Sequence, residues 1–133
     1  MKFSALGALI LAVLLATNAR AEDIVVIVNP ASAPLSKEQI ADIYLARNNA
    51  WTPIDQAAGS AIYTEFYKRA TGRDAAQVKA IWSKILFTGR GVPPKQLLDS
   101  KAVKKAVAAN PKAVGYIEKS AVDASVKVAM PLF

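Results

Sequence analysis

A chain of 133 residues is long enough for one domain, and its 17 basic and 10 acidic side chains give a net charge of +7 at pH 7. It contains neither cysteine nor histidine, which excludes disulfides and histidine- or cysteine-based catalysis and leaves few donors for structural zinc. The positive charge favours anionic ligands or acidic surfaces. Because the lysines are scattered and no nucleic-acid-binding motif accompanies them, we interpret most of them as a solvated surface and expect no nucleic acid partner.

The N-terminal segment has the three parts of a secretory signal peptide. Met1 and Lys2 form a short basic start, residues 5–16 are an apolar run, and residues 19–21 (Ala-Arg-Ala) are a small-x-small cleavage site. A retained anchor is the alternative, but the run is about a dozen residues, whereas a membrane-spanning helix needs about 20. We therefore predict a signal peptide over residues 1–21, a domain over 22–133, a periplasmic location and no stable membrane insertion after cleavage.

The first elements of the predicted domain are a strand and a helix. The β-branched run of residues 23–29 predicts a strand that is buried on both faces. Ser36 and Gln39 then form a capping box, which predicts a helix over residues 37–46. Trp51 lies in the following loop, and we expect it to fold back onto the core.

A second strand and helix follow. Residues 53–56 predict a short strand, and residues 57–60 (Ala-Ala-Gly-Ser) predict a small-residue turn. Ser60 is the expected N-cap of a helix that runs to Thr71, and Gly72 is its expected C-terminal stop.

The next helix has the clearest amphipathic pattern in the chain. Asp74 and Gln77 repeat the capping-box pattern, and the helix is expected to end near Thr88 and Gly89. Its apolar residues recur at helical spacing: Val78, Ile81, Trp82, Ile85 and Leu86. We predict that Trp82 belongs to the core.

The remaining chain predicts a stiff basic loop over residues 90–94, a helix from an N-cap at Ser100 to Ala109, and two strands at 113–117 and 125–130. Strands and helices are thus mixed along the chain. This order predicts an α/β fold in which helices cover a sheet.

Two segments could bind a ligand. At Gly59-Ser60-Ala61, the unpaired amides of a helix start and the helix dipole favour an anion, although Ser60 could simply cap its helix. Arg90 lies between two glycines, and a guanidinium makes bidentate bonds to phosphate or carboxylate, although this segment could equally be an ordinary surface loop. No nucleophile–base pair and no metal-ligand spacing is present, so we expect neither an enzyme nor a cofactor or metal.

Several segments in this order resemble the phosphate-type substrate-binding proteins of ABC transporters. They are Ile24–Pro30 (IVVIVNP), Leu35–Leu45 (LSKEQIADIYL), Trp51, Gly59-Ser60 and Ala113–Ile117 (AVGYI), and the likeness spans about residues 24–130. A short branch that carries one lobe also has a segment similar to Leu86–Pro94. The resemblance implies a single lobe of the type II periplasmic-binding-protein fold and a phosphate-like oxyanion at Gly59, Ser60 and Ala61, with Arg90 assisting.

The sequence departs from that family at the expected site. Ala61 and Ile62 follow Ser60 in place of glycine and threonine, and the position of the anion-binding arginine is occupied by Asp55 or Gln56. A single lobe offers an open half-site, which a homodimer or an envelope partner would complete. Two hypotheses follow: a solute-binding protein for an ABC transport system, and a non-catalytic envelope interaction module whose ligand site has decayed.

Overall fold

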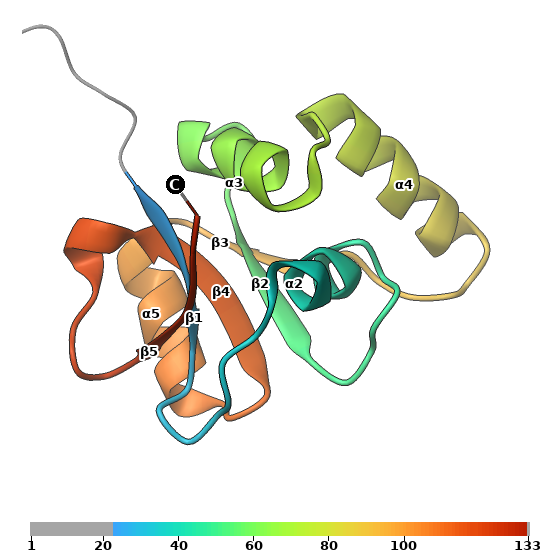
Figure 1. Cartoon of the computed structure of the whole chain (residues 1–133). Helices are drawn as coiled ribbons and strands as arrows, with labels where there is room; N and C mark the ends of the chain where they lie inside the picture. The colour runs from blue at the N-terminus through green and yellow to red at the C-terminus, as the bar shows by residue number, and fades with distance from the viewer. Residues whose placement is uncertain (1–22, 133) are drawn as a thin grey trace, which may run out of the picture.

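A mixed five-stranded sheet organises residues 23–132, the part of the chain that the computed structural model describes (Figure 1). The strand order is β3-β2-β4-β1-β5; β2 is parallel to β3 and β4, whereas β1 is antiparallel to β4 and β5. The predicted signal peptide of residues 1–21 lies outside the described residues. The elements are β1 (Ile24–Val28), α2 (Lys37–Tyr44), β2 (Thr52–Gln56), α3 (Ala61–Thr71), α4 (Ala75–Phe87), β3 (Lys95–Leu97), α5 (Ser100–Ala109), β4 (Ala113–Glu118), the 3-10 turn η1 (Lys119–Ala121) and β5 (Lys127–Leu132).

The helix boundaries follow from local capping chemistry. Both predicted capping boxes are present, at Ser36 for α2 and at Asp74 for α4. Gly72 ends α3 with a φ of 72°, a left-handed conformation that glycine adopts without a steric penalty. The predicted α/β fold, with helices on a mixed sheet, is confirmed.

Some predicted details are wrong. The loop after α4 continues into a strand, β3, whose three residues pair with β2 but carry too little β-propensity to predict it. Ser100 is not the N-cap of α5: Asp99 accepts the Ala102 amide at 2.9 Å. Helix α2 ends at Tyr44, before Ala46 takes a φ of 65°.

The last strand is also displaced from its prediction. It covers residues 127–132 rather than 125–130, because Ser125 belongs to a turn in which its amide donates to the Asp123 side chain. The remaining predicted strands and helices are present with boundaries close to those expected.

The two faces of the sheet carry different cores. On β1, Val26 and Val28 face a large aromatic core under α2, α3 and α4, whereas Val25 and Ile27 face an aliphatic core under α5. This alternation is the two-residue period of a strand that is buried on both faces. Figure 1 shows α5 on one side of the sheet and the other helices across from it, with α4 farthest from the central strands.

The aromatic core explains the position of both tryptophans. Trp82 is buried, as predicted, and its indole N–H donates to the Tyr44 carbonyl at 3.0 Å. Trp51 is half-buried and packs against the same core, as its predicted folding back requires. None of the helices described over residues 23–132 combines the length and hydrophobicity needed to span a bilayer.

Candidate functional site

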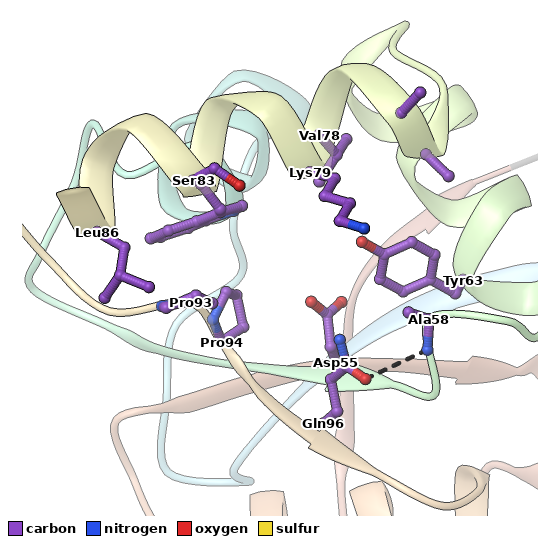
Figure 2. Close-up of a pocket in the computed structure, with 13 residues that line it drawn as sticks. Asp55, Ala58, Tyr63, Val78, Lys79, Ser83, Leu86, Pro93, Pro94 and Gln96 are labelled. Carbon is purple, nitrogen blue, oxygen red and sulfur yellow. Dashed lines mark hydrogen bonds between the residues drawn. The ribbon is translucent and has the colours of Figure 1, made fainter.

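A cavity of about 430 Å³ lies between α4 and the C-terminal ends of β2 and β3. Asp55 of β2 and Gln96 of β3, which are paired in register, lie at its base, and α4 runs above them (Figure 2). The cavity lies beside the turn that joins β2 to α3. Its lining residues are Asp55, Ala58, Tyr63, Ala75, Ala76, Val78, Lys79, Trp82, Ser83, Leu86, Pro93, Pro94 and Gln96.

Asp55 is the charged group at the base of this cavity. Only 2% of its surface is exposed, and its two carboxylate oxygens each accept one tyrosine hydroxyl at 2.8 Å, from Tyr116 and from Tyr67. Burial raises the pKa of Asp55 to about 7, although the two hydrogen bonds lower it. Burial and the neighbouring carboxylate raise the pKa of both tyrosines, so they remain protonated donors.

Gln56, the next residue of β2, points to the opposite face of the sheet. Its side-chain amide donates to the Ser100 hydroxyl at 2.9 Å and to the Tyr116 carbonyl at 3.0 Å. The hydroxyl of Ser100 in turn donates to the Glu118 carboxylate. Gln56 is therefore engaged in a structural network under α5 and does not line the cavity.

The turn at Gly59-Ser60-Ala61 is at the edge of the cavity rather than inside it. Ala58 and Tyr63 line the cavity. Gly59, Ser60 and Ala61, which were predicted to bind an anion, do not line it. The Ser60 hydroxyl donates to the Ala57 carbonyl at 2.7 Å and accepts the Tyr63 amide at 3.3 Å. The hydroxyl proton is therefore already donated to the Ala57 carbonyl, while the hydroxyl oxygen caps α3.

The backbone of this turn retains unused donors. Within residues 23–132, the amides of Gly59, Ala61 and Ile62 make no hydrogen bond to the protein. Gly59 and Ala61 are exposed. The start of the 11-residue helix α3 thus presents free N–H groups beside the cavity.

Arg90 lies in a different hollow. This second cavity, of about 470 Å³, is lined by Arg90 together with Trp51, residues 91–94 of the loop after α4 and Lys95 of β3. Trp82, Pro93 and Pro94 separate the two cavities, because they line both. The structure does not bring Arg90 to the same cavity as the turn at Gly59.

Sequence reasoning did not identify Lys79 and Gln96 as site residues, whereas Tyr63 was among the aromatic residues that could line a pocket or belong to the core. Lys79 is an exposed residue of α4 whose side chain points toward the Tyr63 hydroxyl in Figure 2. Gln96 accepts the Ala58 amide at 3.3 Å and so joins β3 to the turn before α3. No local pattern marks the neighbourhood of these residues, because it forms only when α3, α4 and β3 come together in the folded domain. Among the described residues, no group of three acidic side chains could hold a metal ion.

Three solved structures share this fold. An ABC-type phosphate transport receptor from Vibrio cholerae matches with a TM-score of 0.62 and 20% identity, covering 80% of this chain and 45% of that one. A structure with bound phosphate, described as a phosphate ABC transporter substrate-binding protein from Clostridium perfringens, has a TM-score of 0.65 and 22% identity, covering 81% and 44%. PstS from Borrelia burgdorferi has a TM-score of 0.52 and 14% identity, covering 74% and 41%.

The chain has the fold of one part of a phosphate-type ABC receptor. It spans less than half the length of each of the three receptors, and identities of 14% to 22% establish a likeness of fold. The resemblance expected from the sequence motifs is confirmed at this level. No protein-family model and no curated protein sequence matches the chain. The three similar structures are receptors rather than enzymes.

Proposed function

We propose that the protein is a periplasmic solute-binding protein, exported by the segment of residues 1–21, whose solute carries a phosphate-like oxyanion. The cavity between α4 and the C-terminal ends of β2 and β3 is the observation that carries this proposal. In open α/β sheets, ligands bind outside the carboxyl ends of the strands. Its volume of about 430 Å³ falls in the usual range for small-molecule sites.

The free amides at the start of α3 are the groups that would hold the oxyanion. A helix N-terminus carries partial positive charge, and its first N–H groups have no partner within the helix. Lys79 adds a full positive charge from α4, and it forms no ion pair within residues 23–132. Oxyanion binding at the edge of the cavity, between Lys79 and the turn at Gly59, follows from these charges. Arg90 would assist only an anion in the second cavity.

Calorimetric titration of the purified protein with phosphate and sulfate tests this proposal. The informative variant is Ala61→Pro, which deletes one amide at the first helical position, where proline is tolerated. Ser60 precedes it with a φ of −83° and a ψ of 153°, a conformation compatible with a following proline. We expect oxyanion affinity to fall several-fold without loss of thermal stability.

The matched control is Lys37→Pro, which occupies the first position of α2 and lies after an equally extended Ser36. It should leave oxyanion affinity unchanged. Absence of heat and of thermal stabilisation with millimolar phosphate and sulfate would reject inorganic oxyanions as ligands, and equal effects of the two proline variants would reject the turn as the site.

A second candidate function is docking onto an envelope partner. Exposed apolar side chains at the end of α4 and in the following loop favour it: Leu86 is 54% exposed, Phe87 92% and Val92 75%. Pull-down from envelope extract, repeated with Phe87→Ser, Val92→Ser and Arg90→Ala, tests this candidate. Retention that is unchanged in all three variants would exclude this surface as the docking site.

A further inference from the structure

An uncompensated carboxylate lies at the base of the cavity. Among the described residues, Asp55 is the one buried acidic or basic side chain, and it takes no part in the three ion pairs found there. A buried charge is costly unless it is paired, so buried carboxylates usually have a cationic partner. Asp55 has no such partner among residues 23–132, yet it borders a cavity open to ligands.

The surrounding core holds this carboxylate in a defined orientation. The two tyrosines that donate to it, Tyr67 and Tyr116, are completely buried. The ring of Tyr116 stacks on Phe66 with centroids 3.8 Å apart, which restricts its movement. Each carboxylate oxygen keeps further acceptor capacity beyond its one tyrosine. Figure 2 shows the carboxylate pointing into the cavity, toward Tyr63 and Lys79.

The walls above the carboxylate are largely apolar. Val78, Trp82 and Leu86 project from α4, and Pro93 and Pro94 face them across the cavity. From base to rim, the cavity therefore presents the carboxylate acceptor of Asp55, then aliphatic and aromatic walls, and then Lys79. At about 430 Å³, the cavity is also larger than an inorganic oxyanion requires.

We propose that the cavity binds a small organic zwitterion whose cationic nitrogen pairs with Asp55 and whose oxyanion meets Lys79 and the first turn of α3. This inference rests on the proposed solute-binding function and specifies its ligand class. An inorganic oxyanion deep in the cavity would face a like charge in a desolvated site, whereas an ammonium group supplies the missing partner. A short carbon chain between the two groups fits the apolar walls.

Paired titrations with 3-aminopropylphosphonate and propylphosphonate at pH 7.5 test the inference, because the two probes differ by the amino group. We expect the aminated probe to bind about tenfold more tightly or better, given the strength of charge-assisted hydrogen bonds. In Asp55→Asn, the two probes should bind equally. In Lys79→Ala, both should weaken by a similar factor, because the oxyanion contact is common to them.

The outcomes separate this inference from the proposed function. If propylphosphonate or inorganic phosphate binds as tightly as the aminated probe, the zwitterion is rejected while oxyanion binding stands. If propylamine binds as tightly as the aminated probe, oxyanion recognition is rejected. If none of the four compounds binds, both are rejected. Circular dichroism of Asp55→Asn controls for misfolding, and if that variant does not fold, the wild-type preference between the paired probes decides.

Discussion

Helices α5 and α4 cover opposite faces of the same sheet, and they do so in different ways. Val103 and Val107 of α5 are completely buried against β1 and β4, and α5 is closely packed on the sheet. Helix α4 contains more apolar residues than α5, but they are less confined to one face than those of α5, contrary to the prediction that α4 has the clearest amphipathic pattern. Only Val78 and Trp82 among its residues are buried. A cavity separates much of α4 from β2 and β3.

The difference shows that apolar residues on a helix face predict that this face will be buried. They do not predict which part of the molecule will bury it. In α5 the cover is the sheet itself, and Gly115 of β4 allows the close approach: a Cβ there would lie 2.5 Å from a methyl group of Val103. In α4, part of the apolar surface borders a cavity, and Leu86 and Phe87 are exposed. The buried polar residues follow the same division. The side-chain nitrogen of Gln56 on the α5 side has two hydrogen-bond acceptors, whereas Asp55 on the α4 side has no cationic partner among residues 23–132.

The largest expected effect is on the pH dependence of the free energy of unfolding, and it comes from Asp55 on the α4 side of the sheet. The pKa of Asp55 is raised to about 7, so the folded state binds this proton more tightly than the unfolded chain. The free energy of unfolding should therefore fall as the pH rises from about 4 to about 7, by up to about 4 kcal/mol at about 1.4 kcal/mol per pKa unit, and level off above. Asp55→Asn should abolish this decrease in urea unfolding measured from pH 5 to 8.

Asp123, which pairs with Lys104 of α5, is the control for Asp55, because its pKa is lowered rather than raised. The hydrogen bond from Lys104 lowers the pKa of Asp123, so its contribution to stability is lost only in acid. Asp123→Asn should leave the decrease between pH 5 and 7 intact. The sequence has no histidine to obscure that range. A flat wild-type profile would show that Asp55 is not desolvated as described.

An intermediate effect on the free energy of unfolding is expected from adding a methyl group at a glycine. The effect should be large at Gly115, which is closely packed under α5, and small at Gly59, which is exposed near the cavity. Gly115→Ala places a methyl group against Val103 and Val107, and overpacking of this kind costs about 1–3 kcal/mol. Gly59→Ala, where a Cβ meets nothing within 4 Å, is the matched control and should change the free energy of unfolding by less than about 0.5 kcal/mol. Equal destabilisation in chemical denaturation would contradict the close contact of α5 with β4.

The smallest expected effect concerns the exposed end of α4. Phe87→Ser removes an aromatic ring that is 92% exposed, so the free energy of unfolding should change by less than about 0.5 kcal/mol. Val107→Ser, on the buried face of α5, should destabilise by several times that amount because it buries a hydroxyl in an aliphatic core. A large loss of stability in Phe87→Ser would mean that this residue packs against the domain and is not available to a partner.

Local signals were sufficient for most of the fold. Side-chain capping at Ser36, Ser60 and Asp74, and the glycine stop at Gly72, depend on residues close in sequence, and all four are present as predicted. Strand β3 was missed because its three residues become a strand only by pairing with β2. The cap of α5 was misplaced by one residue because Ser100 has partners, Gln56 and Glu118, that are far away in the sequence.

At the candidate site, even more of the important contacts join residues that are distant in the sequence, so fewer of them could be predicted. The turn at Gly59 was recognised because a small-residue turn before a helix is a local pattern, and its free amides follow from helix geometry alone. That Asp55 accepts two tyrosine hydroxyls, and that Lys79 lies across a cavity from it, could not be predicted, because these groups come from separate elements.

By itself, the sequence determined the order of the strands and helices apart from β3, because hydrophobic periodicity and caps act between near neighbours. Its motifs, through their resemblance to phosphate-type receptors, indicated the likeness of fold to one lobe of such a receptor. Only the tertiary structure decided that Arg90 and the turn at Gly59 border different cavities, and that a buried carboxylate with no cationic partner among residues 23–132 lies at the base of one of them. The physical reason is that strand pairing and helix packing bring together residues distant in the chain, and electrostatic interactions depend on that proximity.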